Sequence, residues 1–140
     1  MSEILPGLFL GSKVDAMDVN FLTENNITCI LNVAKSTYSI YYDESLNIDV
    51  LKIPLIDHPS ENIKIELDLG YSFINLSILQ NRNILVHCVA GISRSSTFVL
   101  YYLMKKYNMN LTDALNFSRQ KRQIIRPNSG FLKTLFESMN

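Results

Sequence analysis

Several features that would assign this 140-residue sequence to a common class are missing from it. Its 13 Lys and Arg residues balance its 13 Asp and Glu residues, so no strong attraction to nucleic acid or to an anionic membrane is expected. No apolar run approaches the roughly 18 residues of a membrane span. The Met1-Ser2-Glu3 start shows neither a signal peptide nor the Met-Gly pattern of myristoylation. We therefore expect no nucleic-acid partner and no membrane anchor.

Cysteine and metal ligands are scarce too. The two cysteines, Cys29 and Cys88, form no framework of paired spacings. Because the sequence shows no signal peptide and no membrane-length apolar run, we expect a cytoplasmic location, with the nucleus as the second option, and thiols stay reduced there. No cluster of His, Cys, Asp or Glu has metal-ligand spacing, and the sequence predicts neither a metal nor a cofactor.

What the chain does contain is enough apolar sequence for one core. With 47% hydrophobic residues, a chain of this length buries roughly 70% of its unfolded surface. Repeats, low-complexity tracts and linkers are absent, so residues 1–140 are expected to form a single domain. The oligomeric state stays open.

Hydrophobic periodicity predicts alternating strands and helices. Residues 63–80 fit both a strand and a helix pattern at their start, but the helical pattern continues over four turns, and this length favours a helix. Alternation of this kind is typical of an α/β fold in which helices flank a central, largely parallel sheet. The predicted strands are 8–10, 27–33, 49–55 and 84–86, and the predicted helices are 14–25, 63–80, 96–104, 111–122 and 131–139.

A long loop is predicted at residues 35–47. It contains Tyr38, Tyr41 and Tyr42 with no clear period. These tyrosines either lie half-buried under the loop, which we favour, or form the rim of a binding site.

The segment from His87 to Ser95 carries the chemistry. A buried strand precedes it and an apolar helix follows it, and this arrangement turns backbone N–H groups and a helix N-terminus toward one point, where anions bind. The helix N-terminus and Arg94 both favour the nucleophilic thiolate form of Cys88. Arg94 has a planar fork of donors that fits two phosphate oxygens, and Gly91 lets the backbone N–H groups face inward. Ser95 can place a hydroxyl near the sulfur.

This Cys–(five residues)–Arg segment resembles the signature loop of the cysteine-dependent dual-specificity protein phosphatases. The resemblance implies a protein tyrosine phosphatase-like fold of the small, atypical kind, without the docking domain of the MAP-kinase phosphatases. It also implies that Cys88 is the nucleophile and that the loop binds the phosphate. The likeness covers nearly the whole chain, through residues 4–12, 30–34, 53–57, 101–104 and 126–131, and the implied phosphate-binding residues are Val89, Ala90, Gly91, Ile92, Ser93 and Arg94.

A proton donor for the leaving group is expected on a loop. Asp57 follows the strand 49–55 and matches the position of the family's general acid, while Asp49 and Glu61 are the competing carboxylates. The adjacent His58 is interpreted as a solvated loop residue. Because His87 precedes the nucleophile, the resemblance implies that it orients the loop rather than acting as a base.

Two further residues have two possible roles each. Asn128 is expected to brace the site, and a simple helix-start turn is the alternative. Cys29 is expected to be a small core residue, and a redox partner of Cys88 is the alternative, since a reactive thiolate oxidises readily.

The sequence therefore predicts an enzyme that hydrolyses phosphotyrosine and phosphoserine or phosphothreonine esters in proteins through a cysteinyl-phosphate. Two alternatives remain. The first is a phosphatase of a phosphoinositide, an RNA 5′ end or a glucan. Inositide phosphatases carry lysines inside the loop, whereas Val89, Ala90, Ile92 and Ser93 are uncharged. The second is a pseudophosphatase that binds phosphorylated partners without turnover.

Overall fold

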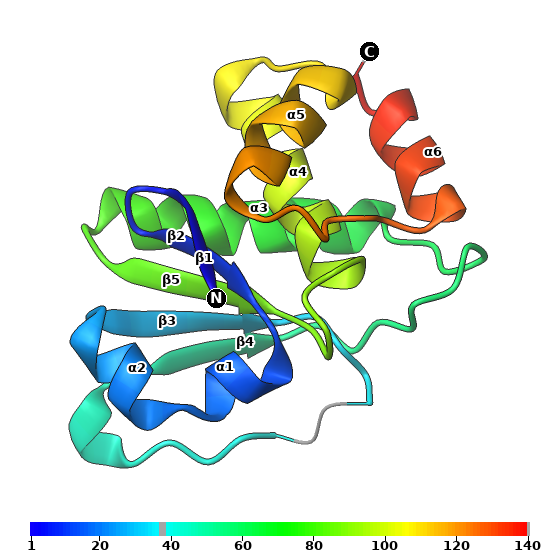
Figure 1. Cartoon of the computed structure of the whole chain (residues 1–140). Helices are drawn as coiled ribbons and strands as arrows, with labels where there is room; N and C mark the ends of the chain where they lie inside the picture. Colours follow the sequence, from blue (N-terminus) through cyan, green and yellow to red (C-terminus); the bar gives the residue numbers. More distant parts are fainter. Residues whose placement is uncertain (37–38, 140) are drawn as a thin grey trace.

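A five-stranded sheet forms the centre of the molecule (Figure 1). The structure is a computed structural model that describes residues 1–36 and 39–139. Its strand order is β1-β2-β5-β3-β4; the pair β1 and β2 is antiparallel, and the remaining neighbours are parallel. The predicted α/β architecture with a largely parallel sheet is therefore confirmed. The strands are β1 (Ser2–Leu5), β2 (Leu8–Gly11), β3 (Ile27–Asn32), β4 (Asp49–Lys52) and β5 (Asn83–His87).

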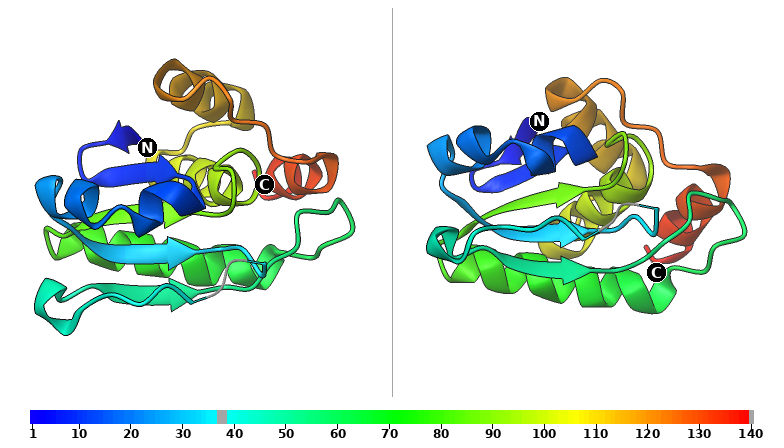
Figure 2. Two further views of the ribbon diagram at one scale, coloured as in Figure 1. Left: turned by 60° about the horizontal axis from the view of Figure 1, so that its bottom comes forward. Right: turned by 90° about the horizontal axis from the view of Figure 1, so that it is seen from below.

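Helices cover both faces of the sheet (Figure 2). Two short helices lie on one face, and the longer helices lie on the other, where α4 packs between α3, α5 and α6. The helices are α1 (Lys13–Met17), α2 (Val19–Glu24), α3 (Lys64–Leu79), α4 (Arg94–Tyr107), α5 (Leu111–Lys121) and α6 (Ser129–Glu137), with a short 3-10 helix at Glu44–Leu46. No helix in the described part of the chain is both long and apolar enough to cross a membrane.

The strand residues divide between two cores because successive side chains point to opposite faces. On the central strand β5, Ile84 and Val86 pack into the large core under α3 and α4, while Leu85 packs into the smaller core under α1 and α2. Both faces of β5 are therefore buried, which explains the continuous apolar run that marked it in the sequence.

The N-terminal third differs from the prediction. Ser2–Leu5 forms a strand that was not predicted, and it pairs with β2. The predicted helix over 14–25 is wrong as one element: it breaks at Asp18, whose carboxylate accepts a hydrogen bond from Phe21 N (3.1 Å) and caps α2. Val14 is 74% exposed, whereas Leu22 is buried in the smaller core.

The elements around the site agree better with the prediction. Helix α3 spans the predicted range within one residue at each end. Its Gly70 is required by packing, because a Cβ there would lie 2.4 Å from the ring of Phe98. Strand β4 ends at Lys52, earlier than predicted, since Pro54 has no N–H for a sheet ladder.

The predicted loop at 35–47 contains the Glu44–Leu46 turn of 3-10 helix. Tyr41 is exposed, whereas the Tyr42 hydroxyl donates to Ala16 O (2.7 Å), and burial raises the pKa of Tyr42 to about 12. Tyr42 is thus half-buried under the loop, as favoured; Tyr38 lies outside the described residues.

Candidate active site

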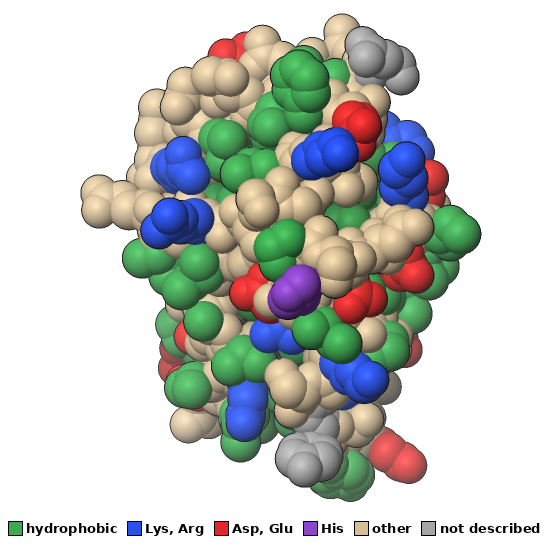
Figure 3. Space-filling model, turned by 90° about the vertical axis from the view of Figure 1, so that its right-hand side faces the viewer, with side chains coloured by type: hydrophobic (Ala, Val, Ile, Leu, Met, Phe, Trp, Pro, Cys, Tyr) green, Lys and Arg blue, Asp and Glu red, His purple; other side chains and the backbone are tan. Residues whose placement is uncertain are grey.

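The carboxyl ends of the parallel strands form one end of the molecule, and Figure 3 shows that end. Strand β5 ends at His87, residues 88–93 form a loop, and α4 begins at Arg94. Basic side chains are scattered here among acidic and apolar ones, over the described part of this surface. No single basic patch marks the described part of this face, so the donors of the loop and the guanidinium of Arg94 are the groups that could recognise an anion here.

The Cys88 thiol is buried at the base of this loop. Its Sγ accepts a hydrogen bond from Gly91 N (3.3 Å) and lies 3.1 Å from Ser95 Oγ. Both contacts are suited to a thiolate, which needs donors, and the start of α4 adds the positive end of a helix dipole. The structure thus brings together Cys88, Gly91 and Ser95, as predicted from their spacing.

The carbonyl groups of the loop all point outward. Each of the five carbonyl groups from Val89 to Ser93 accepts a hydrogen bond from a group outside the loop. The backbone N–H groups of Val89, Ala90, Ile92 and Ser93, in contrast, have no hydrogen-bond acceptor among the described residues. The loop therefore forms a cradle of free N–H donors beside the sulfur, which is an anion-binding arrangement. The outer donors are Lys13 N, Arg122, Arg126 N, Ser96 Oγ and Thr97.

Arg94 stands at the junction of the loop and α4. Its guanidinium donates to Leu55 O (3.0 Å), while its buried Nε has no partner among the residues described. A buried guanidinium N–H without an acceptor is costly unless a ligand supplies one. Phosphate oxygens are acceptors of the right geometry.

Asp57 reaches the loop from the segment after β4. Its Oδ1 accepts hydrogen bonds from Ser93 Oγ (2.7 Å) and from Asn128 Nδ2 (3.0 Å). Asn128 also uses its backbone N to donate to Ser93 Oγ (3.0 Å), and its Oδ1 caps α6 at Phe131 N (2.9 Å). Both alternatives for Asn128 are therefore present at once: it braces Asp57 and it starts a helix.

The other carboxylates lie elsewhere. Asp49 begins β4, at the opposite end of that strand, and forms an ion pair with Arg82 (2.6 Å). Glu61 accepts a hydrogen bond from Ile56 N (3.4 Å) within its own loop. His58 is exposed, and its ring bonds to Ser60 in a turn. Of the three carboxylates, the structure brings Asp57 to the loop of Cys88.

His87 is buried behind the nucleophile. Its Nδ1 lies 3.1 Å from Cys88 O, so the proton is assigned to Nδ1, the nitrogen that donates to this carbonyl. Burial lowers the pKa of His87, and the hydrogen bond to Cys88 O opposes that shift only in part. A neutral, buried imidazole that holds the backbone of Cys88 suits an orienting role.

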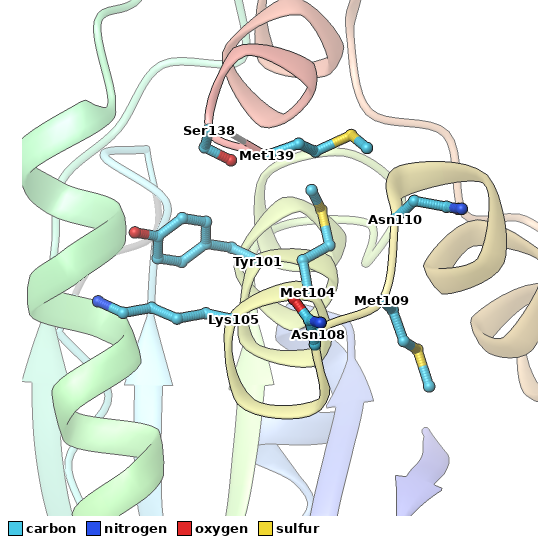
Figure 4. Close-up of a pocket in the computed structure, with 8 residues that line it drawn as sticks. All are labelled: Tyr101, Met104, Lys105, Asn108, Met109, Asn110, Ser138 and Met139. Atoms are coloured by element: carbon cyan, nitrogen blue, oxygen red, sulfur yellow. The ribbon is translucent and has the colours of Figure 1, made fainter.

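A cavity of about 540 Å³ opens beside these groups, with Lys35, Ile56, Asp57 and Arg94 among its lining residues. A second cavity, of about 440 Å³, lies between α4 and the C-terminal residues and includes Lys105 (Figure 4). Lys105 lies eleven positions after Arg94 on the same helix, a distance of about 16 Å along α4. The second cavity is therefore remote from the thiol.

Comparison with known proteins identifies the family. The sequence model described as "Dual specificity phosphatase, catalytic domain" matches residues 8–140. The chain is 38% identical to dual specificity protein phosphatase 1B of Arabidopsis thaliana over 135 residues, which are 96% of this chain and 79% of that protein. The chain belongs to the dual specificity protein phosphatase family. Its class is that of the cysteine-dependent protein phosphatases, as the resemblance implied.

Solved structures confirm the phosphatase fold. DUSP15 superposes with a TM-score of 0.92 at 37% identity, covering 99% of this chain and 86% of that one. Human tyrosine phosphatase-like serine/threonine/tyrosine-interacting protein superposes with a TM-score of 0.90 at 35% identity, covering 99% and 94%. Some curated relatives are much longer: the chain spans 35% of human dual specificity protein phosphatase 9.

Cys29 is a core residue of the phosphatase and lies far from Cys88. Both thiols are free and buried. Cys29 on β3 lies opposite Ile84 on β5. Cys88 follows Ile84 by four residues, just beyond the end of β5, which places it about 13 Å further along the strand direction. A disulfide needs Cα atoms about 4.4–6.8 Å apart, so the redox partnership would require the sheet to come apart.

The sequence does not predict that Arg122 binds the phosphate-binding loop. Its Nε donates to Gly91 O (3.0 Å) and its Nη2 to Ala90 O (3.4 Å). A cation at the C-terminal end of a helix is ordinarily explained by the helix dipole, so the position of Arg122 in the sequence carries no signal for a role in a loop 31 residues earlier. No group of three or more His, Cys, Asp or Glu residues within 1–36 and 39–139 could hold a metal ion.

Proposed function

We propose that this phosphatase hydrolyses phosphotyrosine and phosphoserine or phosphothreonine esters in proteins through a cysteinyl-phosphate on Cys88. The observation that carries the proposal is the loop itself. The sulfur lies at the base of a cradle whose carbonyls are all bound from outside, which leaves its N–H groups for a phosphate. Such preorganised donors stabilise charge that develops in a transition state.

The reaction consists of two displacements at phosphorus. In the first, the Cys88 thiolate forms the S–P bond as the ester O–P bond breaks, and Asp57 gives its proton to the leaving oxygen. In the second, Asp57 takes a proton from water, the water oxygen bonds to phosphorus, and the S–P bond breaks. Arg94 binds the equatorial oxygens throughout, and Ser95 stabilises the departing thiolate from 3.1 Å.

Protein phosphoesters are the proposed substrates for two reasons. The loop residues Val89, Ala90, Ile92 and Ser93 are uncharged, so the loop offers no cation for the extra phosphates of an inositide. The balanced net charge likewise offers no general attraction to RNA. We propose further that residues 1–140 act as one catalytic domain in the cytoplasm or nucleus, where Cys88 stays reduced.

A second candidate is binding of phosphorylated partners without turnover. It is favoured by one relative, since a protein at 35% identity is named phosphatase-like and interacting. The presence of Cys88, Arg94 and Asp57 supports turnover instead.

A nucleophile swap tests the proposal. The purified chain is expected to release phosphate from a generic aryl phosphate in the presence of a metal chelator, and Cys88→Ser is expected to abolish that release. Cys29→Ala is the matched control, because it alters the other buried thiol, and it should retain turnover. Full activity of Cys88→Ser would refute the mechanism. Binding of a phosphopeptide by the unaltered chain without phosphate release would favour the second candidate.

A further inference from the structure

Arg122 holds the phosphate-binding loop from its outer side. It follows α5 directly and is half-buried against the loop. Its guanidinium divides three arms between two regions: two arms donate to Ala90 O and Gly91 O, and Nη1 donates to Ser2 Oγ (3.2 Å) on β1. The edge hairpin and the loop are thus joined through one side chain.

The two carbonyls that Arg122 binds belong to two successive peptide units. In a trans peptide, the C=O and the following N–H point in opposite directions. The Ala90 carbonyl points to Arg122, and the Gly91 N–H of the same unit points to Cys88 Sγ (3.3 Å). In the next unit the Gly91 carbonyl points to Arg122, which turns the Ile92 N–H toward the anion site.

Gly91 fits this arrangement closely. It has φ +70, a conformation that L side chains rarely adopt, and a Cβ there would lie 2.5 Å from Arg122 Nη2 and 2.6 Å from Gly11 O. The turn of the loop is therefore enclosed between the end of β2 and the guanidinium. A peptide flip here would direct a carbonyl oxygen at a bound phosphate, and the two charge-assisted hydrogen bonds oppose that flip.

We propose that Arg122 is a positioning residue for catalysis, which fixes the orientation of the two peptide units on either side of Gly91, so that the Gly91 N–H faces the Cys88 sulfur and the Ile92 N–H faces the phosphate. The proposal rests on the proposed function, since it assigns Arg122 to the same anion site. Arg122 contacts the loop at two carbonyl oxygens on its outer side, so it acts through the backbone.

The experiment compares Arg122→Gln, Arg122→Lys and Lys121→Gln. Lys121 is the exposed neighbour of Arg122 and makes no hydrogen bond or ion pair with the loop among the described residues, so its variant controls for the loss of one positive charge near the site. Arg122→Gln is expected to lower kcat/KM about 10–100-fold and to raise the inhibition constant of inorganic phosphate about tenfold. Arg122→Lys, which keeps the charge without the fork, should recover only part of the loss. Lys121→Gln should match the unaltered chain.

The inhibition constant distinguishes positioning from stability, because a smaller folded fraction lowers the rate without changing phosphate affinity. An unchanged constant in folded Arg122→Gln overturns the proposal, as does an equal loss in Lys121→Gln. If Arg122→Gln does not fold, Arg122→Lys carries the test, and full activity in it is the contrary result.

Phosphate binding to Cys88→Ser protein, measured by calorimetry with and without Arg122→Gln, separates the two proposals. Weaker binding in the double variant supports the role of Arg122 even if the unaltered chain proves inactive. Equal binding, or none in either protein, overturns it.

Discussion

Two loops at the same edge of the sheet are held in opposite ways. The loop after β5, residues 88–93, has each of its carbonyls bound by a group outside it. The loop after β4 is exposed from Ile56 to Ser60, and its backbone hydrogen bonds there close turns within the loop, such as His58 N to Ile56 O (3.0 Å). One loop is fixed by the fold, and the other is fixed mainly by itself.

The difference corresponds to two tasks. An anion site must have its donors in place before charge develops, because reorienting them during the reaction costs energy. A proton donor must meet leaving groups of different shape. Asp57 touches the fixed loop only through side chains, and its Oδ2 has no hydrogen-bond partner in the part of the chain described. The Ser93 hydroxyl is where the two loops meet.

Among the changes that separate the tasks of the two loops, removal of the acid Asp57 is expected to have the largest effect. Asp57→Asn should lower kcat about 10²–10⁴-fold for substrates with a poor leaving group, because no proton then reaches the departing oxygen. The inhibition constant of inorganic phosphate should stay unchanged, since the fixed loop is untouched. Steady-state kinetics on aryl phosphates of graded leaving-group pKa measures both quantities.

Glu61→Gln is the matched control on the same loop, and it should keep most of the activity. A larger loss in Glu61→Gln than in Asp57→Asn would move the acid role to Glu61. Weaker phosphate binding in Asp57→Asn would show that the two loops do not divide their tasks.

Removal of the link between the loops is expected to have a smaller effect. Ser93→Ala deletes the 2.7 Å hydrogen bond that positions Asp57. The loss of about 1–1.5 kcal/mol should lower kcat about tenfold. Because that hydroxyl acts through Asp57, Ser93→Ala should have little further effect in an Asp57→Asn background.

Ser96→Ala is the control for this double-mutant cycle of Ser93 and Asp57. The Ser96 hydroxyl donates to Ile92 O (2.7 Å) and Ser93 O (2.9 Å), so it braces the fixed loop alone. Its effect should persist in the Asp57→Asn background. Equal, additive losses for both serines would mean that Ser93 acts on the loop and not on Asp57.

The sequence predicted what is local along the chain and missed what depends on folding. Cys88, Gly91, Arg94 and Ser95 lie within eight residues, so their spacing alone defined the loop. The strands β3 and β5 were predicted because burial on both faces leaves an unbroken apolar run. Asp57 was placed by the resemblance, and the geometry adds what holds it.

The misses have tertiary causes. Arg122 acts across 31 residues on Gly91 O, which no local pattern records. Strand β1 (Ser2–Leu5) has only four residues, too few for a clear periodicity, and its pairing with β2 holds it extended. The break at Asp18 interrupts an otherwise helical pattern, and the cap it provides to Phe21 N is visible only once α2 is known.

The two histidines, one beside each loop, give the smallest predicted effect. Burial holds the pKa of His87 below its usual 6.5, whereas His58 is exposed. The unfolded chain therefore binds a proton to His87 at a higher pH than the folded protein does. The contribution of neutral His87 to the free energy of unfolding is complete above about pH 6.5 and falls as the pH drops toward the lower, folded pKa, by at most about 1.4 kcal/mol per pH unit.

Urea denaturation at pH 7.5, 6.5 and 5.5 should show a smaller loss of stability for His87→Gln than for the unaltered chain, and His58→Gln should follow the unaltered chain. Parallel curves for all three proteins would mean that the fixed loop tolerates a charged His87, and that its rigidity does not depend on keeping this imidazole neutral.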